Sequence, residues 1–273
     1  MRKIKNNKLA KLKTKTIINA IFALSLLPAI SANAGKTSSP IIHIVTEHLP
    51  PYQIVSDNKP IFGFAVDIIK ETMARSHFAY SLKSYPWVRS YKLAQVKANH
   101  CIFSVARLKS REHLFKWVGP ISQVNNTAMW AQKDKRVTVT NLEDAKNYTI
   151  AVNRDDIGHT GLVERGFIEN KHLYVLDDAK SLVNVLLTRP EIDLIVADDS
   201  TISFRAELVG ANINELQRVF EIQDLPLNFF FACSKKTADK TISHLAEQLQ
   251  SIHQDGTYDA IWEKWRSKLI SAK

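Results

Sequence analysis

The sequence predicts an α/β protein built on parallel strands. Short apolar segments of strand type alternate with longer segments of helical periodicity, and this alternation is typical of parallel sheets with helical crossovers. Segments such as residues 192–197 (IDLIVA) are apolar apart from Asp193, as expected of a strand covered on both faces. In such sheets, ligands bind beyond the carboxyl ends of the strands.

Apolar periodicity predicts the individual elements. Strands are expected over residues 41–46, 80–85, 102–106, 127–132, 148–153, 173–176, 192–197 and 227–233. Helices are expected over residues 65–76, from 86–87 onward, and over 158–167, 179–188, a segment ending at 208, 238–254 and 257–269. The Gly119 and Pro120 pair marks a change of character, after which a second series of strands and helices begins.

The first 34 residues read as a secretory signal. Seven Lys or Arg and no acid lie between residues 2 and 15, an apolar segment covers 17–30, and Ala32-Asn33-Ala34 is a small-x-small cleavage site. We therefore expect export and cleavage after Ala34. A membrane anchor is the alternative, although the apolar segment is short for a bilayer span.

The net charge of the chain depends on this leader. The whole chain has 37 basic and 27 acidic residues and a formal charge of +10. Without the seven leader cations, 30 basic residues face 27 acidic ones and the charge is +3. We therefore do not expect nucleic-acid binding, which needs a basic face on the folded part. The remaining 239 residues suffice for one large or two medium domains.

Cysteine and histidine usage limits the cofactor chemistry. Cys101 and Cys233 each adjoin a strand-like segment of an exported chain, so they either form a disulfide or remain two buried thiols. The nine histidines show no metal-ligand spacing. No cofactor fingerprint is visible, and we expect neither a metal nor a cofactor.

The stretch 101–120 (CIFSVARLKSREHLFKWVGP) is the candidate anion site. A strand-like segment leads into three cations, Arg107, Lys109 and Arg111. The planar fork of arginine can hold both oxygens of a carboxylate. The alternative is that these cations lie on a solvated turn.

An acidic pair follows the strand expected at residues 192–197. Asp198 and Asp199 mirror the arginine of the first half, so charges of both signs are expected at strand ends. Asp199 or Ser200 is also a candidate cap for the helix that follows.

Five motifs in order make the chain resemble a known family. They are PPY (50–52), GFAVDI (63–68), SREHLFKWVGP (110–120), DLIVADD (193–199) and DGTYDAIWEKW (255–265). The chain resembles the family-3 extracellular solute-binding proteins, which serve polar amino-acid uptake by ABC transporters.

The resemblance implies a two-lobed type II periplasmic-binding-protein fold. Each lobe would be a twisted mixed sheet with flanking helices, and two hinge strands would join them around a ligand cleft. Residues 35–124 and 229–273 would form the first lobe, and residues 125–228 the second. The resemblance also places Cys101 and Cys233 on neighbouring strands, which favours the disulfide.

The resemblance further assigns roles in the cleft. Arg111 would hold the α-carboxylate of an amino acid and Asp198 its α-ammonium, because each charge of a desolvated zwitterion needs a counter-charge. Tyr52 and Trp87 would cover the apolar part of the ligand. Glu47 would reach toward its side chain.

Residues at three positions that precede Arg111 in the sequence differ from those common in the family. A glycine is common seven positions before it and hydroxyl residues five and three positions before it, whereas this chain has Ser104, Ala106 and Leu108. Two expected carboxylate donors are therefore missing. Ser104 stays among the candidate ligand-binding residues.

The loop before the second-lobe helix also departs from the pattern, because it reads Asn-Arg-Asp-Asp over residues 153–156. Backbone N–H groups near residues 156–159 are expected to face the carboxylate. If Arg107 or Arg154 compensates for the missing donors, the ligand could be another small acid or a peptide-like molecule. Arg89 is expected on a helix surface.

The resemblance implies a monomeric, non-enzymatic periplasmic protein that captures an amino acid or related small polar solute and delivers it to an inner-membrane ABC permease. Two alternatives remain open. One is a periplasmic enzyme similar to cyclohexadienyl dehydratases, in which a cleft carboxylate acts as general acid. The other is a ligand-sensing subunit that docks on a membrane receptor.

Overall fold

A computed structural model describes residues 40–57, 59–122, 126–177, 180–199, 201–223, 225 and 228–271, with the side chains of the last helix described as far as residue 266. The expected signal at residues 1–34 lies outside this part of the chain. Among the described residues, no helix combines the length and the apolar character that a membrane span requires.

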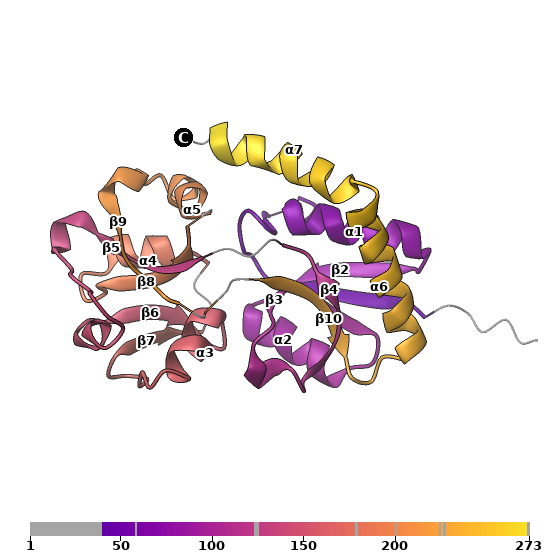
Figure 1. Cartoon of the computed structure of the whole chain (residues 1–273), viewed down its shortest axis with the longest axis horizontal. Helices are drawn as coiled ribbons and strands as arrows, with labels where there is room; N and C mark the ends of the chain where they lie inside the picture. The colour runs from indigo at the N-terminus through magenta and orange to yellow at the C-terminus, as the bar shows by residue number, and fades with distance from the viewer. Residues whose placement is uncertain are drawn as a thin grey trace, which may run out of the picture. The chain divides into compact units, whose positions relative to one another are not determined.

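The chain forms two five-stranded mixed sheets (Figure 1). The first has the order β2-β1-β3-β10-β4 and consists of β1 (Ile42–Thr46), β2 (Tyr80–Ser84), β3 (His100–Ala106), β4 (Phe115–Pro120) and β10 (Phe229–Ser234). β1 pairs in parallel with β2 and β3, whereas β10 runs antiparallel to β3 and β4. The return of β10 to the first sheet brings the late part of the chain back beside the early part.

The second sheet repeats this plan. Its order is β7-β6-β8-β5-β9, and its strands are β5 (Thr127–Gln132), β6 (Ile150–Asn153), β7 (Leu173–Leu176), β8 (Leu194–Asp198) and β9 (Leu216–Glu221). β6 pairs in parallel with β7 and β8, and β5 is antiparallel to β8 and β9. The sheets are thus mixed, as the resemblance implied, rather than wholly parallel.

Helices cover both faces of each sheet, which explains the apolar strands. On the first sheet, α1 (Phe64–Ser76), α6 (Asp239–Gln254) and α7 (Thr257–Ser271) contribute to one apolar cluster and α2 (Trp87–Val96) to another. The second sheet carries α3 (Ile157–Val163), α4 (Leu182–Thr188) and α5 (Ile202–Leu208). In β8, Leu194 and Val196 enter one cluster while Ile195 and Ala197 enter the other, so both faces are packed.

Most expected elements are confirmed, with three corrections. The helix expected over residues 158–167 ends at Val163, and Gly166 adopts a left-handed backbone with φ of 81° that a helix cannot continue through. β4 and β9 were not predicted. The N-cap of α5 is Thr201, so the assignment of that role to Asp199 or Ser200 was wrong.

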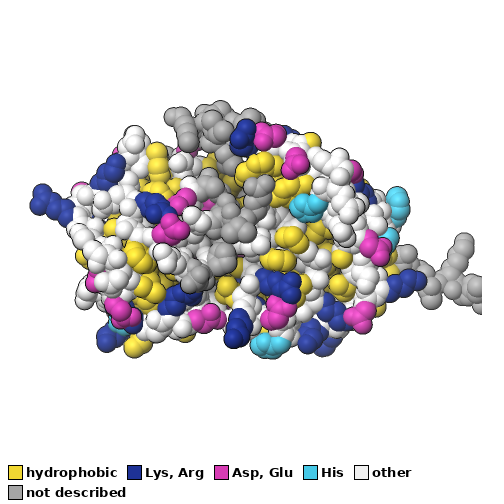
Figure 2. Space-filling view, in the orientation of Figure 1, with side chains coloured by type: hydrophobic (Ala, Val, Ile, Leu, Met, Phe, Trp, Pro, Cys, Tyr) yellow, Lys and Arg dark blue, Asp and Glu magenta, His cyan; other side chains and the backbone are white. Residues whose placement is uncertain are grey.

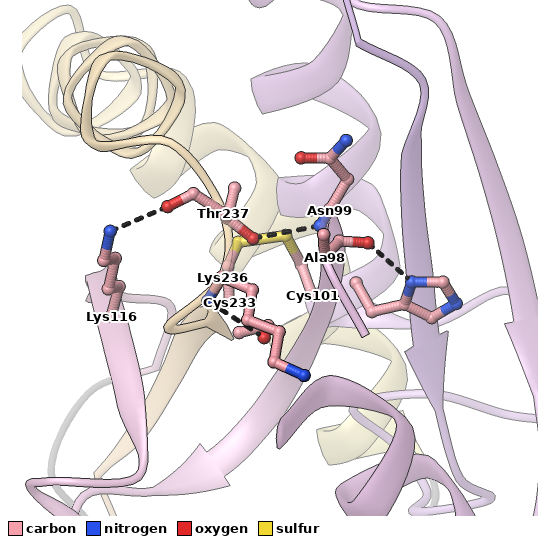
Figure 3. The surroundings of a disulfide bond; sticks show 9 residues. Ala98, Asn99, Cys101, Lys116, Cys233, Lys236 and Thr237 are labelled. Carbon is pink, nitrogen blue, oxygen red and sulfur yellow. Dashed lines mark hydrogen bonds between the residues drawn. A yellow bond between two sulfur atoms is a disulfide. The ribbon is translucent and has the colours of Figure 1, made fainter. Parts of the chain in front are cut away.

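The two cysteines form a disulfide, as the resemblance favoured. Cys101 on β3 and Cys233 on β10 are register partners on antiparallel strands, and both are fully buried. Figure 3 shows Thr237 beside the bond, where its hydroxyl accepts the Asn99 N–H and its carbonyl accepts the Lys116 ammonium. The bridge closes a loop of 132 residues that contains the whole second sheet.

The described surface carries charges of both signs. On the face shown in Figure 2, Lys and Arg side chains are interspersed with Asp and Glu. Many are paired, as in the cluster of Arg75 with Glu71 and Asp255 that ties α1 to the turn between α6 and α7.

Candidate functional site

A cavity of about 370 Å³ lies between segments of the two sheets. Its walls come from the loop after β1, the carboxyl ends of β3, β6 and β8, the first turns of α3 and α4, helix α5 and the start of β10. This is the edge at which parallel α/β sheets bind ligands. The charged and imidazole side chains on its wall are Glu47, His48, Arg111, Asp156, Lys180, Asp198 and Arg205.

Arg111 is a buried cation on this wall. A short 3₁₀ turn over Lys109–Arg111 follows β3 and turns the side chain inward, where only 3% of it is exposed. Its Nη2 donates to the Asp155 carbonyl (2.8 Å), the Asp156 carbonyl (3.1 Å) and the Thr160 hydroxyl (3.2 Å). Its Nη1 donates to the Ala106 carbonyl at 3.3 Å.

All these acceptors are neutral oxygens. Among the described residues, no carboxylate forms an ion pair with Arg111. Burial lowers the pKa of its guanidinium, because a desolvated charge is destabilised. The guanidinium also lies over the rings of Trp87 and Tyr91, with centroid distances of 5.8 Å and 5.4 Å.

Trp87 joins the same contact. It begins α2, is 5% exposed and lines the cavity. Its indole Nε1 donates to the Asp155 carbonyl at 2.8 Å. Asp155 adopts a left-handed backbone with φ of 57°, and its carbonyl thus receives donors from both Trp87 and Arg111. These bonds connect segments of the first sheet to the loop before α3.

Asp198 ends β8 and is fully buried on the cavity wall. Its Oδ2 accepts the Thr201 hydroxyl and Arg205 Nη2, the latter at 3.1 Å. Arg205 comes from α5, and its Nε also donates to the Pro50 carbonyl at 3.0 Å. The acid predicted to hold a ligand ammonium is therefore already paired with a cation of the chain.

Comparison with known proteins identifies the family of this chain. The model of the bacterial extracellular solute-binding proteins, family 3, matches residues 41–268. The chain belongs to this family. No curated protein matches the sequence. The family membership confirms the resemblance that the five motifs indicated.

Similar solved structures show the same fold. A histidine kinase sensor domain with similarity to periplasmic binding proteins is 19% identical, with a TM-score of 0.71, over 83% of this chain and 96% of that one. The arginine-, lysine-, histidine-binding protein ArtJ of Geobacillus stearothermophilus is 19% identical, with a TM-score of 0.69, over 83% and 95%. An ancestral arginine-binding protein is 17% identical, with a TM-score of 0.67, over 82% and 97%. The family-3 chain thus has the type II periplasmic-binding-protein fold.

Asp156 was expected only as part of a loop that offers N–H donors. In the family-3 chain it caps α3 instead, because its Oδ1 accepts the His159 N–H at 2.6 Å and its Oδ2 accepts the Asn153 N–H at 3.2 Å. Burial raises the pKa of the Asp156 carboxyl. The N–H of His159, which we expected to face a ligand carboxylate, is therefore taken by the chain.

Of the remaining predicted site residues, two line the cavity and one does not. Glu47, half-buried after β1, and Ser104 both line the cavity. Tyr52 does not, because it packs its ring edge-on against Phe229 at 4.8 Å, and Phe229 forms the wall in its place. Ser104 donates to Gln53 Oε1 at 2.7 Å. Ser104 has a left-handed φ of 58°, so the glycine that the family favours at this position has a conformational reason.

Neither the two arginines considered as compensating groups, Arg107 and Arg154, nor Arg89 lines the cavity. Arg107 pairs with Glu112, Arg154 pairs with Asp177, and Arg89 lies over the Tyr85 ring at 4.2 Å. The expectation for Arg89 is confirmed.

Three charged or imidazole side chains on the wall were not predicted from the sequence: Arg205, Lys180 and His48. His48 Nδ1 accepts the Val55 N–H, so its neutral form carries the proton on Nε2. Burial, with the nearby cations Lys180 and Arg205, lowers the pKa of His48. In the described part of the chain, no cluster of three His, Cys, Asp or Glu side chains could hold a metal ion.

Proposed function

We propose that this family-3 chain is a periplasmic binding protein that captures an amino acid or related small organic acid and delivers it to an inner-membrane ABC transporter. We assign residues 35–124 and 229–273 to one lobe and 125–228 to the other, with the cavity as the cleft between them. The boundaries fall at or beside positions 123–125 and 226–227, which lie outside the described residues.

One observation carries this proposal. Arg111 is buried on the wall of the cavity, and its hydrogen-bond acceptors are all neutral oxygens, with no carboxylate of the described residues within ion-pair distance. A buried guanidinium is destabilised until an anion pairs with it. A ligand carboxylate would supply that anion and match the planar fork of the side chain.

Family membership supports the delivery step and the leader pattern supports the periplasmic location. Structural neighbours that bind arginine, and an amino acid ABC transporter substrate-binding protein from Streptococcus pneumoniae, are consistent with an amino-acid-sized ligand. The cavity volume of about 370 Å³ falls within the range of small-molecule sites.

Two of the three cavity acids, Asp156 and Asp198, do not favour the enzyme alternative. A general acid must present a titratable oxygen to the substrate. Both oxygens of Asp156 accept backbone N–H groups, and Asp198 is paired with Arg205. Incubation with prephenate or arogenate should therefore yield no aromatic product, and appearance of that product would establish catalysis.

Thermal unfolding tests binding. The protein is unfolded in guanidinium, refolded to remove any bound solute, and heated with a panel of amino acids, small carboxylic acids and short peptides. A ligand at about 100 times its Kd adds about 2.7 kcal/mol to the unfolding free energy, which corresponds to a rise of roughly 5 to 10 °C in Tm. A panel without any shift would contradict the proposal.

A further inference from the structure

We propose that the cavity selects a carboxylic acid with an apolar body and no free ammonium group, because Arg205 already occupies the acid that an ammonium would use. This inference rests on the proposed function and narrows it to a class of ligand.

The Arg205–Asp198 ion pair blocks the acid that a ligand ammonium would need. Asp198 is fully buried, and its Oδ2 lies 3.1 Å from Arg205 Nη2. Arg205 is itself held, because its Nε donates to the Pro50 carbonyl at 3.0 Å and only 19% of its side chain is exposed. An incoming ammonium would have to displace this guanidinium and leave it without a counter-charge, which is unfavourable in a desolvated site.

Asp156, a second acid on the wall, offers little in its place. The Asp156 carboxylate accepts the N–H groups of Asn153 and His159 and caps its own helix. Glu47 is the third acid on the wall, and it is half-buried. Among the described residues, neither Arg111 nor Lys180 forms an ion pair with any carboxylate. The cations without an acidic partner are therefore available to a ligand anion.

The uncharged part of the cavity wall favours a ligand with an apolar body. Side chains from helices α2, α3 and α4 and from strands β8 and β10 make it largely apolar, including Trp87, Ile157, Leu182, Val183, Ile195 and Phe229. Apolar surface of a ligand gains stability by leaving water against such a wall. A hydrocarbon or aromatic body with one carboxylate directed to Arg111 fits these surroundings better than a small polar zwitterion does.

Matched ligand pairs test the inference by titration calorimetry on the refolded protein. Each pair differs only in the α-ammonium: 3-phenylpropanoate against phenylalanine, and 4-methylpentanoate against leucine. We expect the acid without the ammonium to bind at least about tenfold more tightly, the order of effect for one unfavourable buried charge contact. Tighter binding of the amino acids would overturn the inference while leaving the proposed function intact. If no member of either pair binds and the broader panel shows no shift, both fail.

A variant of Arg205 gives the second readout. Arg205→Leu keeps a side chain of similar volume and removes the cation that pairs with Asp198, so the ratio of amino-acid to acid affinity should rise at least about tenfold. Arg205→Lys retains a cation and should keep the wild-type ratio. Arg218→Leu is the matched control, because Arg218 pairs with Asp199 and does not line the cavity. An unchanged ratio in Arg205→Leu would overturn the inference, and the wild-type ligand pairs decide it if that variant does not fold.

Discussion

Replacing Arg111 by methionine should remove most ligand binding. The change keeps an unbranched side chain of comparable length at a position that is 3% exposed, and it deletes the guanidinium. A ligand carboxylate would then be buried without a counter-charge, which costs about 3 to 5 kcal/mol. Since about 1.4 kcal/mol is a factor of ten, Kd should rise roughly 150- to 4,000-fold.

The assay is titration calorimetry with the ligand that gives the largest thermal shift. Arg107→Met is the matched control, because Arg107 is the same residue type four positions earlier and pairs with Glu112 on the surface. An exposed pair contributes about 0 to 1 kcal/mol to stability and should not affect Kd. Arg111→Lys should be intermediate, because it keeps the charge and loses the planar fork.

The stability of the variant must be measured separately. Arg111 also donates to the Asp155 and Asp156 carbonyls, so Arg111→Met will lower Tm even without ligand. A folded Arg111→Met protein that binds within about threefold of wild type would refute the assignment of Arg111 as the anion-binding residue.

Three further predictions concern closure and stability. Trp87→Phe keeps an aromatic ring but loses the indole donor to the carbonyl before α3, so ligand affinity should fall about two- to tenfold in calorimetry, and no change would argue against that contact. Replacing both cysteines by alanine removes a loop closure of 132 residues and should lower the unfolding free energy in guanidinium titration by up to about 5 kcal/mol, whereas a loss below about 1 kcal/mol would contradict the role of the bridge. Hydrogen bonds from Thr257 and then Arg75 hold the pKa of Asp255 at about 2, below its usual 3.8. Its contribution to stability is therefore present above about pH 4 and is lost as the pH falls toward about 2, so the stability gap between wild type and Asp255→Asn should close across that window, and a constant gap would contradict the ion pair.

The buried strands could be predicted because their sequences report their surroundings. Strands such as β8 are covered on both faces, so every position before the terminal Asp198 is apolar and the segment is visible without any tertiary information. The missed strands β4 (FKWVGP) and β9 (LQRVFE) lie at sheet edges and contain charged side chains. They are strands because β10 and β5 supply hydrogen-bond partners, and no local pattern records that pairing.

The candidate site divides in the same way. Arg111 and Asp198 could be located because each follows an apolar strand, which places both at the ligand-binding edge. Arg205 could not, because its reach to Asp198 depends on how α5 packs after β8. Phe229 lines the cavity where Tyr52 was predicted to do so, and this could not be predicted either, because only the return of β10 to the first sheet brings Phe229 to the wall.

Native mass spectrometry of the protein purified without a refolding step tests the central claim most directly. We expect one small molecule per chain, released on unfolding, whose composition includes a carboxyl group, and we expect Arg111→Met to run at the mass of the bare chain. An adduct without an acidic group, or one that Arg111→Met retains fully, would contradict the account of this cavity as a carboxylate-binding cleft.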